Sequence, residues 1–255
     1  MLIAQLTDTH ITVPKNEIGD CYVKLEALRS CVSAINKLNT APDVVIHTGD
    51  LVHNGSDEEY RLTKSIMDEL RVPYFITPGN RDTVTALIKN FSLHSYQNAE
   101  TAFLQYATNV LGYRLIASDT STGNNNLGFL DFQRLAHLDN LLNEQPERST
   151  VIFMHHPPIN LSNSGLLKHE YENYRMVENF SEIIDRHPQV IGILCGHIHR
   201  SLTGWINATP LLVMPPLSKS LCRDPASYSS TPNTTFYLHA FSTKASVNTE
   251  VITVN

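Results

Sequence analysis

The sequence predicts an α/β fold, because short apolar runs alternate with amphipathic helix patterns over most of the chain. Each run has the length of a buried strand and stops at a turn. The runs are Leu2–Leu6, Val44–Ile46, Tyr74–Ile76, Leu115–Ala117, Val151–Met154 and Val190–Leu194. Alternation of strands with helices is typical of parallel pairing with helices on both faces.

The helix patterns lie between these runs. The next helix after the second run is predicted to begin after Ser56, whose hydroxyl can cap the first turn while Glu59 completes a capping box. The other helices are indicated by apolar residues at helical spacing. These residues are Leu25, Leu28, Val32, Ile35 and Leu38, then Phe132, Leu135, Leu138 and Leu142, then Val177, Phe180, Ile183 and Ile184.

The chain after His199 has a different character, with predicted short strands and no helix patterns between them. These strands are Thr203–Val213, Thr235–Ser242 and Val247–Val254. We therefore expect residues 200–255 to form an antiparallel part of a second sheet packed on the first. Pro215–Pro232 is predicted to be a loop near the functional site, because long loops in compact domains are often functional.

Length and composition predict a single domain over residues 1–255 with an ordinary hydrophobic core. Met1 is followed directly by a predicted strand, without room for a secretory signal, which favours a cytoplasmic location. The four cysteines form no CxxC pair, so we expect reduced thiols.

The charge and hydropathy of the chain restrict its partners. A net charge of −6 argues against binding to nucleic-acid duplexes or anionic membranes, which requires clustered Lys and Arg. The apolar runs are far shorter than the ~18 residues needed to span a bilayer. We expect a small molecule as the partner, and the sequence leaves the oligomeric state open, a homo-oligomer included.

Side chains that bind metals follow five of the predicted strands, at the turn where each strand ends. They are Asp8, His10, Asp50, Asn80, His155, His197 and His199. In an open α/β sheet, ligands bind outside the carboxyl ends of the strands, so we expect these side chains to converge on one pocket. Each short motif is weak alone, and their combination indicates the site. Asp119, after the run Leu115–Ala117, is either a further site carboxylate or a turn cap.

The ligand types favour Zn, Fe or Mn, because imidazole with carboxylate suits these metals better than the all-oxygen shells of Mg or Ca. Asp8 and His10 alternate on a segment that we expect to be extended, so both can face one ion. Asp50 follows a glycine that permits a tight turn, and its two oxygens can bridge two ions. Two ions ~3.5–4 Å apart would acidify a bridging water and hold both oxygens of an in-line displacement. The sequence therefore predicts metal-assisted hydrolysis.

This set of motifs resembles the calcineurin-like metallophosphoesterase family. The matching motifs, within about residues 1–200, are Asp8-Thr9-His10, Gly49-Asp50, Gly79-Asn80, His155 before His156-Pro157, and Gly196-His197-Ile198-His199. The resemblance implies an αββα sandwich of two mixed sheets flanked by helices. The compact length and the motif spacing are most similar to class III cyclic-nucleotide phosphodiesterases and bacterial glycerophosphodiesterases.

The resemblance also implies which residues hold each of two divalent metal ions. The first ion would be held by Asp8, His10, Asp50 and His199, and the second by Asp50, Asn80, His155 and His197. His156 is not a ligand in this assignment, because the family pattern uses the histidine two positions before the proline. The implied activity is hydrolysis of a small organic phosphodiester, such as a cyclic nucleotide or a glycerophosphodiester, by attack of metal-bound hydroxide.

One position departs from the family pattern. The family usually has histidine after the asparagine of the third motif, where it is thought to stabilise the transition state or protonate the leaving oxygen; this chain has Arg81. Arginine is no proton donor at this site, but it can hold a phosphoryl oxygen in bidentate fashion. We therefore expect Asn80 and Arg81 to act in catalysis and to contact the substrate.

Three further residues are candidate substrate contacts. His53 and His156 could also donate the proton that Arg81 cannot, and Lys219 could contact phosphate from the long loop. For each of the three, a packed or solvated side chain is the alternative interpretation.

Two alternatives to the phosphodiesterase hypothesis remain open. One is a phosphomonoesterase or a nucleotide-pyrophosphate hydrolase on the same scaffold. The other is a metal-dependent scaffold that binds partners without catalysis. The complete ligand set argues against the second alternative, whereas Arg81 leaves it open.

Overall fold

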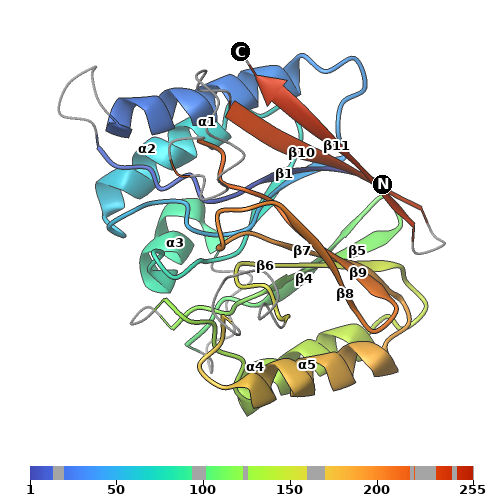
Figure 1. The fold of residues 1–255 in the computed structure, drawn as a ribbon. Coiled ribbons are helices and arrows are strands. Elements are labelled where there is room, and N and C mark those ends of the chain that lie inside the picture. The colour runs from blue at the N-terminus through green and yellow to red at the C-terminus, as the bar shows by residue number, and fades with distance from the viewer. Residues whose placement is uncertain are drawn as a thin grey trace.

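The computed structural model describes residues 1–13, 20–93, 102–122, 126–159, 170–218, 221, 234–242 and 246–254. In this part of the chain, two β-sheets pack face to face and helices cover both outer faces (Figure 1). The elements of the N-terminal half are β1 (Leu2–Leu6), α1 (Asp20–Asn36), β2 (Val44–His47), α2 (Asp57–Met67), β3 (Tyr74–Ile76), α3 (Val84–Phe91), β4 (Tyr106–Val110) and β5 (Tyr113–Ser118). Those of the C-terminal half are α4 (Phe132–Asn143), β6 (Thr150–Met154), α5 (Tyr174–Arg186), β7 (Val190–Cys195), β8 (Leu202–Ile206), β9 (Thr209–Val213), β10 (Thr234–Phe241) and β11 (Val247–Val254).

The two sheets are both mixed, as predicted. The first has the strand order β11-β10-β1-β2-β3, in which β1, β2 and β3 are parallel and the two C-terminal strands are antiparallel. The second has the order β4-β5-β6-β7-β9-β8, with a parallel centre and one antiparallel strand at each edge. This two-sheet arrangement confirms the predicted α/β sandwich.

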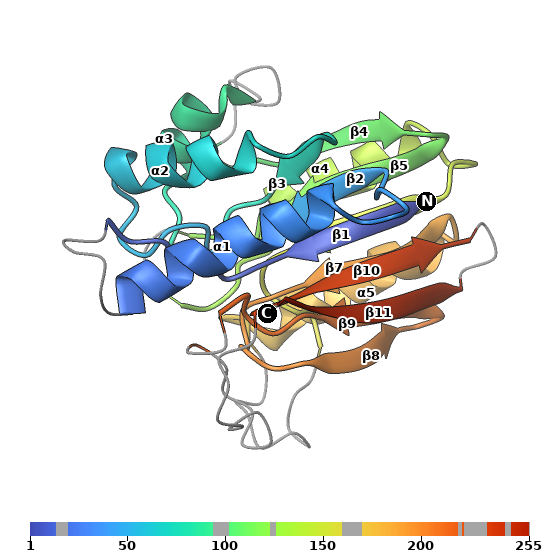
Figure 2. The same ribbon diagram turned by 90° about the horizontal axis from the view of Figure 1, so that it is seen from above.

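The C-terminal tail differs from its prediction, because it is divided between the sheets. Asn207, with φ 53°, reverses the chain between β8 and β9, and β9 then pairs parallel to β7 in the second sheet. The strands β10 and β11 join the first sheet instead, where β10 pairs antiparallel with β1 (Figure 2). The sequence predicts strands in both pairs, but the sheet that each pair joins depends on tertiary contacts.

Alternating side chains build a three-layered core. Ile3 and Val151 face the space between the sheets, where α3 closes the core. Their neighbours point outward: Ala4 packs with α1, and Ile152 packs with α4 and α5. The helices therefore lie on the outer faces of the sandwich rather than on both faces of one sheet. Sequence analysis predicted neither α3 nor β4.

The start of α2 confirms the predicted capping box. The hydroxyl of Ser56 accepts a hydrogen bond from the backbone N–H of Glu59 at 3.3 Å, and the carboxylate of Glu59 accepts one from the Ser56 N–H at 3.2 Å.

Among the residues that the structure describes, no helix has the length and apolar character required to cross a lipid bilayer.

Candidate metal centre

The turns that follow β1, β2, β3, β6 and β7 bring the seven predicted metal ligands together. In the described part of the chain, three sets of side chains, one of which includes His156, have potential ligand atoms within 4.8 Å of one another. The sets are Asp8 with His10 and His199, Asp8 with Asp50 and His155, and His155 with His156 and His197. The convergence arises because the strand ends of both sheets meet along one edge of the sandwich.

The first group consists of Asp8, His10 and His199. The Nε2 atoms of the two imidazoles are 3.1 Å apart, and Oδ1 of Asp8 is 3.3 Å from Nε2 of His199. His199 donates its Nδ1–H to the carbonyl of Leu221 at 2.8 Å, so its Nε2 lone pair faces the group. Oδ1 of Asp8 and Nδ1 of His10 are buried and have no hydrogen-bond partner among the described residues.

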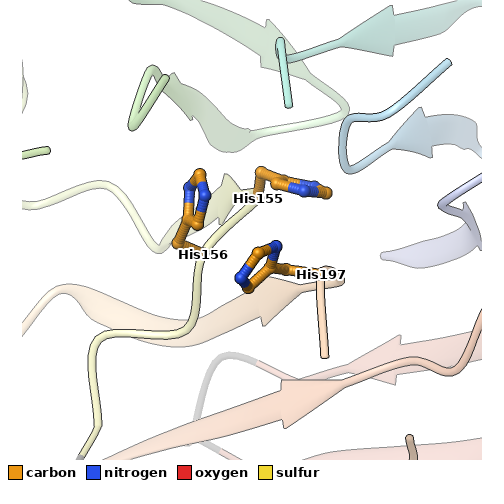
Figure 3. A group of neighbouring side chains, drawn as sticks. All are labelled: His155, His156 and His197. Carbon is orange, nitrogen blue, oxygen red and sulfur yellow. The ribbon is translucent and has the colours of Figure 1, made fainter. Parts of the chain in front are cut away.

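The second group consists of Asn80, His155 and His197. Oδ1 of Asn80 lies 3.1 Å from Nε2 of His155 and 3.1 Å from Nδ1 of His197. His155 donates its Nδ1–H to the carbonyl of Thr48 at 2.8 Å, which leaves Nε2 directed at Asn80. Figure 3 shows the rings of His155, His156 and His197 gathered where β6 and β7 end.

Asp50 lies between the two groups. Its Oδ2 is 3.5 Å from Nε2 of His10, and its Oδ1 is 3.5 Å from Nε2 of His155. The backbone N–H of Arg81 donates to Oδ1 at 2.8 Å, which fixes the carboxylate between the groups. The two oxygens of one side chain thus face different sets of ligand atoms.

The backbone around these ligands has unusual geometry. Five of the seven ligands, all within the described part of the chain, have positive φ: Asp8 (48°), His10 (44°), Asp50 (54°), His197 (73°) and His199 (56°). The expectation that Asp8 and His10 alternate on an extended segment is therefore wrong. Such conformations cost about 1–3 kcal/mol each and persist at functional sites where surrounding contacts impose them.

Gly49 permits the tight approach of these turns. Its φ is +91°, and a Cβ atom there would lie 2.7 Å from Nδ1 of His155 and 2.8 Å from the backbone nitrogen of Gly79. A larger residue at position 49 would therefore separate the turns that carry Asp50, Asn80 and His155.

Electrostatic interactions favour ionised carboxylates at the centre. Burial raises the pKa of Asp8, but His199, His155 and His10 outweigh this effect and hold it well below its usual range. Burial likewise raises the pKa of Asp50, whereas His155 and His10 lower it to about 2. Burial lowers the pKa of His155, but Asp50, Asp8 and the Thr48 carbonyl together raise it to about 9.

The same geometry fits divalent cations. Carboxylate oxygens, an amide oxygen and imidazole nitrogens face one another at 3.1–3.5 Å, and all of these atoms are acceptors when the imidazole rings carry no proton on the facing nitrogen. A proton or a cation between such atoms relieves their repulsion. Mixed imidazole and oxygen ligands suit Zn, Fe or Mn.

A buried carboxylate that the sequence analysis did not single out joins two of the turns. Oδ2 of Asp82 accepts hydrogen bonds from the N–H groups of Gly79 (2.9 Å) and Leu51 (3.2 Å), and its Oδ1 accepts one from the hydroxyl of Tyr60 (3.2 Å). Burial and the charge of Asp50 raise the pKa of Asp82 to about 7. The turn that carries Asp50 is therefore held against the turn that carries Asn80.

The predicted substrate contacts occupy different surroundings. The side chain of Arg81 is exposed, and the ring of His53 lies edge-on to that of His10, with 5.8 Å between centroids. His156 is fully buried, shares a 2.7 Å hydrogen bond between its Nδ1 and Oγ1 of Thr120, and has a pKa well below 6.5 because of burial. Lys219 and most of Pro215–Pro232 lie outside the described residues. The substrate-contact roles of these residues stay predictions.

Asp119 is a turn cap rather than a member of the ligand groups. Its carboxylate accepts hydrogen bonds from the N–H groups of Leu104 and Ser121, each at 2.8 Å.

The structure adds two contacts that the sequence analysis missed. Oε2 of Glu170 lies 3.2 Å from Nε2 of His197, and Oδ1 of Asn126 accepts a hydrogen bond from Nδ2 of Asn80 at 3.2 Å. Neither residue follows a predicted strand, so no sequence signal marked them.

Comparison with known proteins identifies the family. The model for calcineurin-like phosphoesterases matches residues 1–201, which include all seven ligands. The chain therefore belongs to the calcineurin-like phosphoesterase family, which confirms the resemblance found in the sequence.

Two curated relatives and one solved structure illustrate the similarity. A probable glycerophosphodiester phosphodiesterase, GpdQ, of Arcobacter nitrofigilis is 33% identical over 210 residues, which cover 80% of this chain and 74% of the relative. The 3',5'-cyclic adenosine monophosphate phosphodiesterase CpdA of Escherichia coli K12 is 27% identical over 213 residues, which cover 84% of this chain and 74% of the relative. A dimetal phosphatase from Danio rerio superposes with a TM-score of 0.69 at 13% identity. The superposition covers 99% of this chain and 98% of the phosphatase chain, which shows a shared fold.

Proposed function

We propose that this protein hydrolyses small organic phosphodiesters at a centre of two divalent metal ions, Mn, Fe or Zn. Asp8, His10, Asp50 and His199 would hold the first ion, and Asp50, Asn80, His155 and His197 the second. The observation that carries the proposal is the position of Asp50, whose two oxygens lie 3.5 Å from His10 and from His155. As a family member with phosphodiesterases among its relatives, the chain is a metal-dependent phosphodiester hydrolase.

The chemistry divides between the ions and the protein. Bound divalent ions polarise phosphoryl oxygens and lower the pKa of coordinated water. The protein fixes the ligands through the contacts of His155 and His199 with backbone carbonyls and of Asp50 with the Arg81 N–H. In this proposal, the exposed guanidinium of Arg81 would hold a non-bridging phosphoryl oxygen of the substrate.

The leading substrates are glycerophosphodiesters and cyclic nucleotides. The relatives named above are a glycerophosphodiester phosphodiesterase and a cyclic-nucleotide phosphodiesterase. Both substrates are small phosphodiesters, which agrees with a net charge of −6 that disfavours polyanionic partners. A cytoplasmic location and a homo-oligomer stay predictions.

Comparison of two chromogenic substrates tests this function. The protein is treated with a chelator, reloaded with Mn²⁺ and assayed with bis(p-nitrophenyl) phosphate and p-nitrophenyl phosphate; Asp50→Asn controls for contaminating activity. We expect a higher kcat/KM for the diester. A preference for the monoester would indicate a phosphomonoesterase, and no turnover of either would favour a binding scaffold.

A further inference from the structure

Glu170 contacts one of the proposed metal ligands from outside the ligand groups. Its Oε2 lies 3.2 Å from Nε2 of His197, and the exposed fractions of the two side chains are 10% and 11%. Because an ionised carboxylate is only an acceptor, Nε2 of His197 carries the proton in this contact. Nδ1 of the same ring then has a free lone pair, and it faces Oδ1 of Asn80 at 3.1 Å.

The backbone holds Glu170 in place. The N–H of Gly128 donates to the carbonyl of Glu170 at 2.7 Å, and a parallel bridge pairs Gly128 with Tyr171. A Cβ atom at Gly128 would lie 2.8 Å from the ring of Tyr171 and 2.9 Å from Cβ of His156, so these segments are in close contact. The buried hydroxyl of Tyr171 donates to the carbonyl of His156 at 2.8 Å. Glu170 is therefore fixed relative to the turn that carries His155 and His156.

This contact distinguishes the second ligand set from the first. His155 and His199 donate their outer N–H groups to the carbonyls of Thr48 and Leu221, whereas His197 donates to a carboxylate. The first set contains the carboxylates of Asp8 and Asp50, but the second shares Asp50 and is otherwise neutral. A carboxylate behind a ligating histidine fixes its tautomer and raises its basicity.

We propose that Glu170 is a positioning residue that presents Nδ1 of His197 to the second metal ion and adds negative charge to a ligand set poor in carboxylates. This inference rests on the two-metal centre proposed above. It predicts that loss of Glu170 weakens the binding of the second ion selectively.

Metal binding is measured without substrate. Chelator-treated protein is titrated with Mn²⁺ by calorimetry, and bound Mn is counted by atomic emission. The variants are Glu170→Ala and Glu170→Gln, with Glu178→Gln as the matched control, since Glu178 is an exposed carboxylate of α5 that pairs with Arg175 at 3.3 Å. Long-range ¹H–¹⁵N spectra of the metal-free protein report the tautomer of His197.

We expect Glu170→Ala to weaken the affinity for the second Mn²⁺ about 10–100-fold and to leave the affinity for the first nearly unchanged. The control variant should bind both ions with nearly wild-type affinity. Glu170→Gln retains an acceptor oxygen, so it should lose less affinity and keep the Nε2–H tautomer. If Glu170→Ala does not fold, Glu170→Gln and the tautomer of the wild type decide the test. Three results would overturn the role of Glu170 but not the two-metal centre. They are an equal loss of affinity for both ions, an unchanged affinity for the second ion, or a wild-type His197 protonated at Nδ1. A wild type that binds a single Mn²⁺ would overturn the two-metal centre as well.

Discussion

Arg81 is the residue that we propose to influence the reaction without binding metal. Its backbone N–H donates to Asp50, and its side chain is exposed. A guanidinium can stabilise charge that develops on a phosphoryl oxygen, but it cannot protonate an alkoxide leaving group. Diesters with acidic leaving groups should therefore react well, and alkyl diesters should react more slowly.

Two substitutions test this role. Arg81→Ala should lower transition-state stabilisation by about 2–4 kcal/mol, the scale for loss of one charge-stabilising donor. Arg81→His should increase kcat/KM for alkyl leaving groups more than for aryl ones. The measurement is kcat/KM for diesters of graded leaving-group pKa; parallel plots for wild type and Arg81→His would exclude a leaving-group role for Arg81.

The residue scale also shows what sequence patterns can predict about the site. The convergence of the seven predicted ligands could be foreseen because each follows a strand end and carries a side chain able to bind metal. Glu170 and Asp82 could not be foreseen, because their roles depend on contacts with His197 and with the turn of Asp50 that only the folded chain creates. The left-handed conformations of Asp8 and His10 were also missed, since non-glycine residues rarely adopt them.

At the element scale, α2 links a local sequence signal to the site. The capping box of Ser56 and Glu59 starts the helix, and Tyr60 in its first turn donates to Asp82. The helix start thus supports the carboxylate that joins the turns of Asp50 and Asn80.

Removal of the cap should therefore destabilise the fold. Ser56→Ala should lower the free energy of unfolding by about 0.5–2 kcal/mol, because the N–H of Glu59 loses its acceptor. Ser65→Ala is the matched control, since Ser65 is exposed within α2 and should change stability by less than about 0.5 kcal/mol. Urea denaturation of both variants measures the difference; equal stabilities would mean that the cap does not stabilise α2.

Element prediction succeeded where the sequence has a continuous apolar run or several turns of helical periodicity, and failed elsewhere. The predicted apolar residues of α5 and most of those of α1 and α4 are buried, whereas Phe132, which was predicted for the apolar face of α4, is 84% exposed. The eight-residue α3 spans only about two turns, and Thr108 and Asn109 interrupt the apolar residues of β4. Their structure is fixed by packing, as when Leu87 and Phe91 enter the core between the sheets.

At the scale of the whole molecule, a polar chain crosses the sandwich. His239 on β10 shares 2.9 Å hydrogen bonds with Gln5 and Thr249, and Nε2 of Gln5 donates to the carbonyl of Cys195 on β7 at 2.9 Å. Burial lowers the pKa of His239 from 6.5 to about 3. Folding therefore requires the neutral ring.

This requirement makes the fold sensitive to acid. The unfolded chain binds the His239 proton below pH 6.5, whereas the folded chain binds it only near pH 3, so stability is lost as the pH falls between these values. The loss is at most about 1.4 kcal/mol per pH unit for this group. His239→Gln should show a shallower decrease in stability from pH 6.5 to 4, measured by urea denaturation of metal-free protein. Identical slopes for wild type and variant would contradict a buried neutral His239.

The division of the tail between two sheets was not predictable from local patterns. The strands β8 to β11 are all short and, among the described residues, lack intervening α-helices, but β9 pairs parallel with β7 in the second sheet, whereas β10 pairs antiparallel with β1 in the first. Partner choice depends on which buried face each strand completes. The predicted sandwich was correct because the resemblance to the family implied it, and the strand-end motifs that carry this resemblance do not depend on that choice.

The most direct test of the central claim is the number of metal ions that turnover requires. Chelator-treated wild type, Asp50→Ala and Asn80→Ala are titrated with Mn²⁺ while bound Mn and hydrolysis of bis(p-nitrophenyl) phosphate are measured together. Circular dichroism confirms that each variant is folded. We predict that turnover of the wild type rises as a second equivalent binds, that Asn80→Ala loses the second ion and turnover, and that Asp50→Ala loses tight binding of both. Full turnover with one equivalent, or two tightly bound ions and a normal rate in Asp50→Ala, would contradict the two-metal centre.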